Sequence, residues 1–100
     1  MPATHDEDID ALGQIARSAD RTAVVRHLST HPGDYFGAIH KATGISVGSL
    51  GKHLRDLEAA GIIVGDLPLE QRKGRTVRYH VDDKRLRTLV KKLERRLLGQ

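Results

Sequence analysis

Several kinds of protein are excluded by what the sequence lacks. It contains no cysteine, so disulfides, thiolate metal sites and cysteine nucleophiles are excluded. Only three of its 100 residues are aromatic (Tyr35, Phe36 and Tyr79), which argues against single-strand binding by stacking of bases on aromatic rings. No apolar run approaches the ~20 residues that a membrane span needs, and residues 1–10 are too acidic and polar for a secretory signal. We therefore expect a cytoplasmic protein with no membrane partner.

Charge is unevenly distributed along the chain. Lys and Arg number 17 against 13 Asp and Glu, which gives a net charge of +4. Between Arg72 and Arg96 there are eleven basic and three acidic residues, whereas the first twenty residues hold five acidic residues and one basic residue, Arg17. A basic excess favours an anionic partner such as nucleic acid or an acidic surface. We expect one domain over residues 1–100, with its partner-facing surface in the C-terminal half.

The most informative stretch runs from Ser46 to Gly61, and the pattern predicts a helix over residues 46–60. Ser46 is a good N-cap, because its hydroxyl can accept from the unpaired backbone N–H groups of the first turn. Gly61 is a good residue to follow the helix, since glycine adopts the left-handed conformation at least cost. Between them an apolar stripe at spacings of four and three predicts a core-facing side, formed by Leu50, Leu54 and Leu57.

The opposite face of this helix carries Gly48, Gly51, Lys52 and Arg55. A glycine in a helix interior costs about 1 kcal/mol relative to alanine, so two of them call for an explanation. A backbone that must approach a DNA backbone or groove floor closely would supply one. The alternative is an ordinary surface helix that tolerates its glycines.

The segments before this helix complete a helix-turn-helix pattern. Apolar periodicity predicts an N-terminal helix over 6–19 and a second helix over 21–30, with Asp20 as its N-cap. A turn with Pro32-Gly33 follows, then a brief helix beginning at residue 37 and a glycine-containing turn before Ser46. A short helix, a tight turn and a longer capped helix, together residues 37–60, are typical of DNA-binding helix-turn-helix units.

After Gly61 the pattern changes from helical to extended. Residues 62–64 are β-branched, and residues 76–81 alternate apolar and polar side chains. Two such strands make a hairpin over 62–81, whose basic tip over 70–76 would be the wing of a winged helix. The expected fold class is therefore mostly α with a small β-hairpin (α+β).

The last segment, residues 83–98, predicts a C-terminal helix with an apolar seam. Leu86, Val90, Leu93 and Leu97 recur at spacings of four, three and four. Two heptads are too short for an independent coiled coil, but they suit pairing with a symmetry mate and with the N-terminal helix. The alternative is that the seam covers only the core of its own domain.

With these features, the sequence resembles the ArsR-type winged-helix transcriptional regulators and, more loosely, the MarR-type ones. The resemblance lies in the first helix and turn (39–46), the helix with its Lys52-His53-Leu54 step (46–57), its exit (57–63) and the wing (74–81). Residues 19–22 look like the family's helix-opening segment, although arginine replaces the usual proline there. About three quarters of the chain is covered.

The resemblance implies a symmetric dimer held by its terminal helices, with two recognition helices entering successive major grooves. We expect the dimer interface to include Ile9, Leu12, Leu86, Val90, Leu93 and Leu97. Carried over to this sequence, the groove-facing positions are Val47, Gly48, Ser49, Gly51 and Lys52, with Arg55 on the phosphates. Many family members sense metals, but the cysteine pair of the recognition-helix site is absent and the last helix contains no histidine. No metal site of the family's type is expected.

Charge and geometry suggest how the remaining contacts to DNA would form. The N–H groups around Ser46 can approach a phosphate, because those of the first helical turn are unpaired. Lys52 can donate to guanine or to a phosphate. On the wing, Arg72, Lys73 and Arg75 would grip the backbone or reach the minor groove.

Other chemistry is weakly supported by the sequence. His27 and His31 are four residues apart, but Pro32 ends the helix there and no third zinc ligand is evident. The glycines over residues 44–52 do not match a phosphate-binding loop, because position 46 is not glycine and position 53 is neither Ser nor Thr. No nucleophile with a base is recognisable. We expect no cofactor and no enzyme activity.

The sequence therefore predicts a regulator of transcription that binds double-stranded DNA in a sequence-specific way. We expect a homodimeric repressor that reads an inverted repeat through the 46–60 helix and the 70–76 wing. Two alternatives stay open at this stage. One is a winged-helix module that binds protein or RNA, and the other is an architectural DNA binder without sequence preference.

Overall fold

A computed structural model of the chain describes residues 6–99, so the two ends of the domain expected over 1–100 lie outside the described residues. Within them, helices and short strands follow one another in the order α1 (Glu7–Ala16), α2 (Ala19–Thr30), β1 (Asp34–Tyr35), α3 (Phe36–Thr43), α4 (Val47–Ala59), β2 (Ile63–Gly65), the 3-10 turn η1 (Leu69–Gln71), β3 (Arg78–Val81) and α5 (Asp83–Leu98). This is a mostly helical α+β architecture, and the expected fold class is confirmed. No helix within residues 6–99 is long and apolar enough to cross a membrane.

The first two helices are divided differently from the sequence-based prediction. Asp6 caps α1, because its carboxylate accepts from the amides of Asp8 (3.0 Å) and Ile9 (3.2 Å). The helix ends at Ala16, earlier than the expected residue 19. Ser18 then caps α2 by accepting from the Arg21 amide at 3.2 Å, so Asp20 is not the N-cap. Ser18 is the N-cap because its extended backbone places the hydroxyl over the first turn of the helix.

The sheet has three antiparallel strands rather than a two-stranded hairpin alone. β3 lies in the middle, with β1 on one side and β2 on the other. Ile63 pairs with Val81 and Gly65 with Tyr79, while Asp34 and Tyr35 of β1 pair with Tyr79 and Arg78. β1 was not predicted, because two residues cannot show the alternation that identifies a strand. The sheet joins the end of α2 to the base of the wing.

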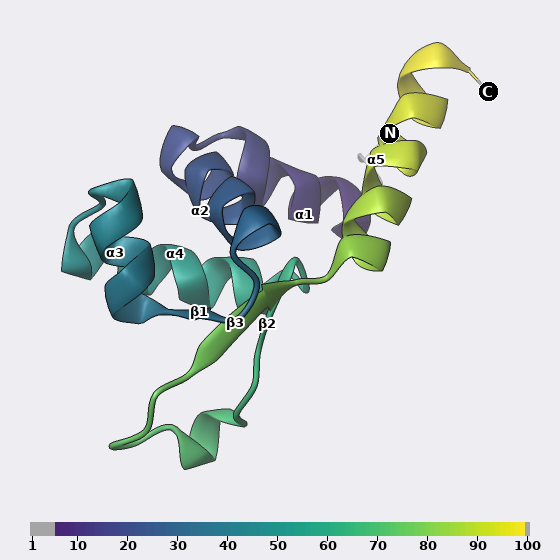
Figure 1. The fold of residues 1–100 in the computed structure, drawn as a ribbon. Coiled ribbons are helices and arrows are strands. Elements are labelled where there is room, and N and C mark those ends of the chain that lie inside the picture. The colour runs from purple at the N-terminus through teal and green to yellow at the C-terminus, as the bar shows by residue number, and fades with distance from the viewer. Residues whose placement is uncertain (1–5, 100) are drawn as a thin grey trace.

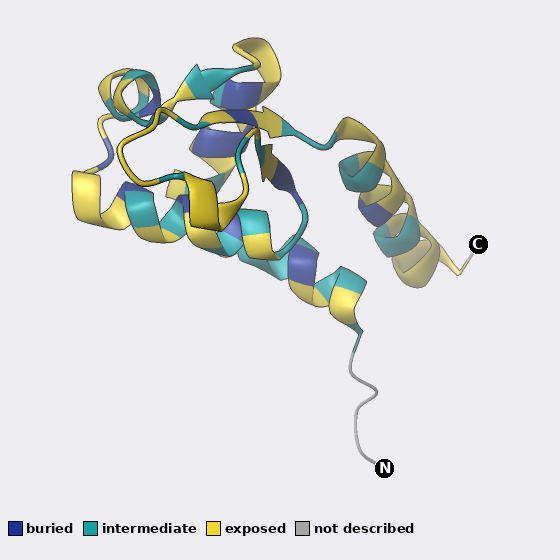
Figure 2. Ribbon diagram, turned by 90° about the horizontal axis from the view of Figure 1, so that it is seen from below, coloured by how far each residue is buried: buried dark blue, intermediate teal, exposed yellow. Residues whose placement is uncertain are grey.

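The core lies where α1, α2, α3 and α4 meet the sheet, and α5 packs on it beside α1 (Figure 2). The apolar stripe of α4 is buried as predicted, since Leu50, Leu54 and Leu57 are at most 2% exposed. The other fully buried large side chains come from α2, α3, the start of β2 and α5, and are Val24, Leu28, Ile39, Ile62, Ile63 and Leu89. The stripe therefore fixes the rotation of α4 about its axis and leaves its other face outward.

Two parts of the chain project from this core (Figure 1). The wing, residues 66–77, leaves one end of β3, and α5 leaves the other. The molecule is accordingly elongated, with principal extents of 47 × 27 × 23 Å. α3, α4 and the wing lie toward one end of the molecule, and the far end of α5 lies at the other (Figure 1).

Candidate nucleic-acid interface

The turn between α3 and α4 sets the angle at which α4 leaves the core. Gly44 ends α3 with a positive φ of 71°, a conformation that glycine adopts at least cost. Ile45 follows and is only 6% exposed, so it closes the corner from inside. Nδ1 of His40 lies 2.6 Å from the Ile45 carbonyl and donates to it, because a carbonyl oxygen can only accept. His40 of α3 thus stabilises the turn.

The first turn of α4 is exposed. The Ser46 hydroxyl accepts from the Ser49 amide at 3.3 Å, and the Ser46 carbonyl accepts from the Leu50 amide at 2.8 Å. Ser46, Gly48 and Ser49 are exposed, and so is the Val47 side chain, at 60%. The positive end of the helix dipole therefore points to solvent at a place where an anion could approach.

The two glycines of α4 are not required by the packing of the protein itself. A Cβ built on Gly48 meets no atom of the described residues within 4 Å. At Gly51 the nearest neighbours would be Arg55 Nη1 at 3.5 Å and a Phe36 ring carbon at 4.0 Å, which is ordinary contact. The cost of helical glycine, about 1 kcal/mol each, is therefore not offset by any close approach within the domain. This surface is shallow because it lacks side chains.

The cations of α4 border this shallow surface. The Lys52 side chain is 66% exposed, and its Nζ lies 3.6 Å from Oδ2 of Asp56. Such an exposed i,i+4 pair is weak, so it leaves the ammonium group available to another anion. Arg55 is also exposed. Together they give the outward face of α4 a positive edge.

Behind this face, Arg21 of α2 joins three side chains and so fixes α4 to α2. Its Nε donates to Nδ1 of His53 at 2.9 Å, which requires that this ring nitrogen carry no proton. Its two Nη groups donate to Asp56 and to the side-chain oxygen of Gln14. Burial alone would raise the pKa of Asp56, but Arg21 and Lys52 outweigh it and lower that pKa. No local pattern indicates the link to α4, because Arg21 lies 32 residues from His53 and 35 from Asp56 along the chain.

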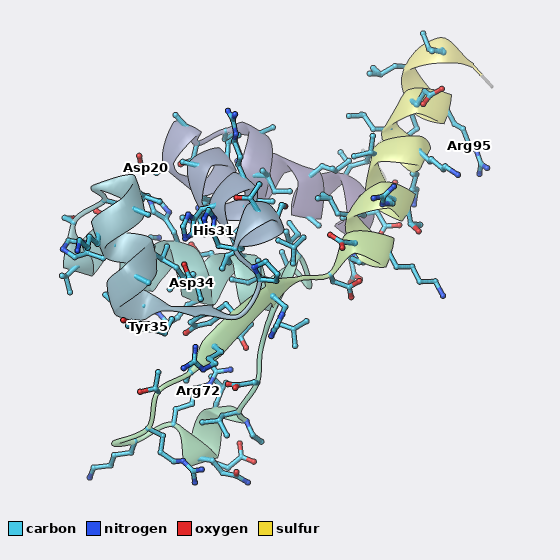
Figure 3. All side chains as sticks on the ribbon, in the orientation of Figure 1. Asp20, His31, Asp34, Tyr35, Arg72 and Arg95 are labelled. Carbon is cyan, nitrogen blue, oxygen red and sulfur yellow. The ribbon has the colours of Figure 1, made fainter. Side chains whose placement is uncertain are left out.

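On the wing, the structure separates the three expected cations. Lys73 and Arg75 are exposed at its tip, where the Arg75 amide donates to the Arg72 carbonyl at 3.0 Å and Gly74 has a φ of 70°. Arg72, labelled in Figure 3, differs from expectation, because its guanidinium binds the Glu58 carboxylate at the end of α4. It is therefore not a projecting tip cation.

A small hollow of about 250 Å³ lies between the wing and the start of α3. All three aromatic residues of the chain line it, together with Arg75, Thr76 and Val77. Arg78 lies next to it with its guanidinium 5.8 Å from the centre of the Tyr35 ring, and its Nη1 donates to the Gly33 carbonyl at 3.2 Å. Burial raises the pKa of Tyr79 in this hollow. The aromatic residues thus support the base of the wing.

The expected dimer residues differ in how far they are buried. Leu12 and Leu86 pack partly against the protein's own core, while Val90 and Leu97 are 50% and 73% exposed. Ile9 and Leu93 have intermediate exposure. Leu89, which the heptad reading omitted, is the fully buried residue of α5. The first half of the apolar stripe therefore covers the domain's own core, and its exposed members lie farther along α5.

Ion pairs connect α5 to the start of α1. Arg85 binds Asp8 at 2.9 Å, Lys92 reaches both Asp6 (3.3 Å) and Asp8 (3.1 Å), and Arg96 binds Asp6 at 2.7 Å. The Lys92 and Arg85 hydrogen bonds lower the pKa of Asp8. The basic residues on this side of α5 thus meet acidic residues of the same chain.

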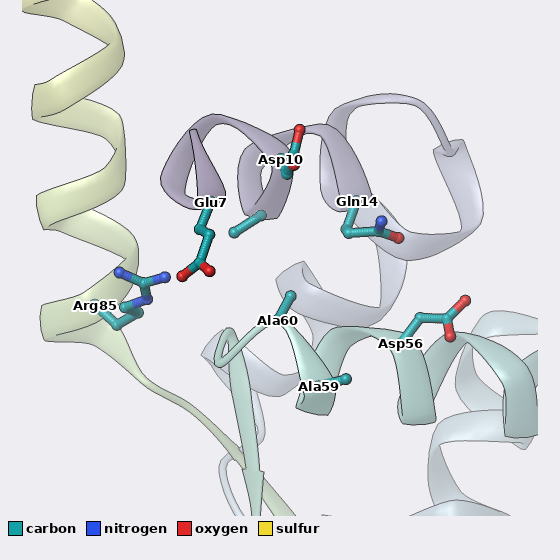
Figure 4. A pocket seen from close by; sticks show the side chains of 8 residues that line it. Glu7, Asp10, Gln14, Asp56, Ala59, Ala60 and Arg85 are labelled. Atoms are coloured by element: carbon teal, nitrogen blue, oxygen red, sulfur yellow. The ribbon is translucent and has the colours of Figure 1, made fainter. Parts of the chain in front are cut away.

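A cleft of about 510 Å³ lies between α1, the end of α4 and the start of α5 (Figure 4). Ala11, Ala59 and Ala60 keep it open, and Glu7 and Arg85 point toward one another at one end. Asp56, which belongs to the Arg21 link, is at the other end.

The two histidines that suggested a zinc pair are engaged otherwise. Nε2 of His27 lies 2.7 Å from Oδ2 of Asp34, and the rings of His27 and His31 stack with centroids 4.5 Å apart. Among residues 6–99, no group of three or more His, Asp or Glu side chains is placed to hold a metal ion.

Comparison with known proteins gives similarity in structure only. No protein-family model matches the sequence, and no curated protein does. An ArsR-family transcriptional regulator superposes with a TM-score of 0.74 at 20% identity, over 98% of this chain and 94% of the other. A homodimeric winged helix-turn-helix DNA-binding domain from Mycobacterium bovis gives 0.64 at 18% identity, over 90% and 84%. The S. aureus MepR–DNA complex gives 0.59 at 16% identity, over 94% and 74%.

These similarities agree with the element order, the tight turn before α4 and the hairpin after it. They cover nearly the whole of this chain, α1 and α5 included. The resemblance to ArsR-type and MarR-type proteins is thus confirmed at the level of structure. The chain has the winged helix-turn-helix fold.

Proposed function

We propose that this protein is a transcriptional regulator that binds double-stranded DNA in a sequence-specific way. The observation that carries the proposal is the outward face of α4, which is shallow, positively edged and not used in the domain's own packing. Gly48 is its clearest element, since nothing described lies within 4 Å of a Cβ built there. A major groove can admit an α-helix, and small residues let the helix lie deep in it.

The contacts follow from this docking. Ser46 and the first-turn amides meet a phosphate, and Val47, Gly48, Ser49 and Gly51 face the bases. Lys52 donates to guanine or to a phosphate, and Arg55 binds the backbone. Lys73 and Arg75 on the wing reach the neighbouring backbone or minor groove. Arg72 is left out of this set, because Glu58 occupies its guanidinium.

The binding unit is a homodimer that reads an inverted repeat as a repressor in the cytoplasm. The exposed apolar side chains of α5, among them Val90 and Leu97, supply a surface for a second copy. Ile9, Leu12, Leu86 and Leu93 border it. The fold similarity to the homodimeric M. bovis DNA-binding domain supports the proposed dimer, and the similarity to the MepR–DNA complex supports the proposed DNA binding. The proposed activity is binding rather than catalysis, in keeping with the fold that the chain shares with transcriptional regulators.

The test is selection of the purified protein on random duplex DNA at about 150 mM salt, followed by sequencing of the bound fraction. We expect an inverted repeat with half-sites about 10 bp apart. Uniform, salt-sensitive retention without enrichment would instead indicate an architectural binder. Absence of duplex binding would favour a protein or RNA partner.

A matched pair of variants ties the result to α4. Gly51→Glu places a carboxylate on the outward face, and we expect it to abolish binding while the thermal unfolding profile stays cooperative. Gly51→Ala adds only a methyl group with ordinary contacts, so it should keep most of the affinity. Retained affinity in Gly51→Glu would contradict the docking mode.

A further inference from the structure

The end of α4 and the wing are joined by an ion pair in which two nitrogens of an arginine bind both oxygens of a glutamate. Glu58 lies in the last turn of α4. Its two oxygens accept from Nη1 (2.9 Å) and Nη2 (2.5 Å) of Arg72, which is fourteen residues later in the chain. The same carboxylate accepts from the Gly65 amide of β2 at 3.3 Å. Bidentate Arg–carboxylate pairs of this kind fix orientation as well as distance.

Arg72 is also held from the wing side. Its Nε donates to the Leu67 carbonyl at 2.8 Å, so the side chain links the first arm of the wing to the end of α4. The Arg72 and Glu58 side chains are only 18% and 22% exposed, which limits screening by solvent. Consistent with this contact, the Arg72 hydrogen bond lowers the pKa of Glu58, and Glu58 raises the pKa of Arg72.

Gly65 makes room for the pair. A Cβ built on Gly65 would lie 2.5 Å from Arg72 Nη2, 3.0 Å from Val77 Cγ1 and 3.1 Å from Glu58 Oε2. Any side chain at this position would push the guanidinium away from the carboxylate. Unlike Gly48 on α4, this glycine is required by contacts within the protein.

The position of Glu58 is otherwise unfavourable. A carboxylate in the last turn of a helix opposes the helix dipole, and on a protein that binds DNA it repels phosphate. Arg72 neutralises that charge and at the same time connects it to the wing. The helix has no basic residue in its last turn that could do so instead.

We propose that Glu58 and Arg72 are positioning residues that hold the wing at a fixed angle to α4, so that both reach DNA as one rigid unit. Arg72 then acts through Glu58 and is not itself a phosphate contact. The inference rests on the proposed DNA binding, whose geometry it specifies. Lys73 and Arg75 depend on the pair, because they lie one and three residues beyond Arg72.

The decisive variant is Glu58→Gln. A positioning role for the pair and a direct phosphate contact by Arg72 predict opposite changes in its affinity for DNA. If the pair positions the wing, removal of this negative charge weakens DNA binding, and the salt slope falls by up to about two units as Lys73 and Arg75 lose their phosphates. If Arg72 were a phosphate contact that Glu58 restrains, the same variant would bind DNA more tightly. Tighter or unchanged binding by Glu58→Gln would overturn the proposal.

A double variant and a charge control complete the experiment. Glu58→Gln combined with Arg72→Gln should lose no more affinity than either change alone, since both break one contact. Additive losses would contradict this. Glu70→Gln removes a negative charge from an exposed position on the wing and leaves the pair intact, so its binding should be equal to or slightly tighter than wild type.

Trypsin cleavage of the DNA-free protein provides a readout that does not depend on the proposed function. Glu58→Gln retains every basic residue of the wing, and we expect faster cleavage after Lys73 and Arg75 than in wild type or Glu70→Gln. Equal cleavage rates would show that the pair does not restrain the wing and would overturn the proposal. If wild type bound no duplex while Glu58→Gln still loosened the wing, the proposed function alone would fall and the restraint would stand.

Discussion

The wing and α5 leave the domain from the two ends of β3, but the rest of the molecule holds them by different means (Figure 1). α5 is fixed by burial, with Leu89 fully buried and Leu86 partly buried against the core. The wing is linked to the end of α4 by a polar contact, the Glu58–Arg72 pair over Gly65. We therefore expect the orientation of α5 to depend on folding of the core, and the angle of the wing to depend on the ion pair while the core stays folded.

The largest effect is expected where α5 enters the core. Leu89→Ala removes a fully buried side chain, and we expect it to lower the free energy of unfolding by about 2–5 kcal/mol. Chemical denaturation measures this directly. Leu97→Ala is the matched control, because Leu97 is 73% exposed within one chain. Equal losses in the two variants at low protein concentration would contradict the assignment of Leu89 to the core.

Acid should separate the wing from the core next. The Arg72 guanidinium holds the pKa of Glu58 below its ordinary value, so the pair stabilises the fold above that ordinary value, about 4.3. The contribution is lost as the pH falls through the lowered pKa. We expect the NMR signal of the Gly65 amide to move below about pH 4. The transition should be absent in Glu58→Gln, and its persistence there would assign it to another group.

Gly65→Ala should affect the wing more than the core. The added methyl group displaces the flexible end of Arg72, so we expect the free energy of unfolding to change by less than about 1 kcal/mol. DNA affinity should nevertheless fall in parallel with that of Glu58→Gln. The comparison is a binding titration beside a denaturation curve. A large loss of stability with normal DNA binding would show that Gly65 serves the core rather than the wing.

The smallest effect is expected at the ion pairs between α1 and α5. Asp8→Asn removes one partner of Arg85 and Lys92, but these charges are close to solvent and screened by salt. The melting temperature should change less than in Leu89→Ala or Gly65→Ala, and the difference should shrink further in 1 M salt. A shift comparable to that of Leu89→Ala would mean that charge rather than burial holds α5.

Local signals carried the predictions that the structure confirms. The Ser46 cap and the leucine stripe are written into one short stretch, and they located the buried face of α4 correctly. Caps, turns and periodicity depend on neighbours in the sequence, so a single chain can reveal them. The winged helix-turn-helix fold followed from their order along the chain.

Features that depend on distant residues were not predicted. The seam predicted from the heptad pattern omitted Leu89, because a helix packed on a globular core buries a wider stripe than a coiled-coil seam does. Arg72 was grouped with Lys73 and Arg75 because sequence shows charge and not direction. One sign was available at Glu58, whose carboxylate at the end of a helix calls for a cation from elsewhere. The predicted DNA-contacting and dimer residues stay predictions.

The open space above Gly48 has a practical consequence for spectroscopy. Because the chain contains no cysteine, Gly48→Cys would introduce its single thiol, at a position where the new Cβ meets no described atom within 4 Å. A spin label or fluorophore attached there would report its surroundings without perturbing the core. In a homodimer, the distance between two such labels would measure the separation of the recognition helices in solution.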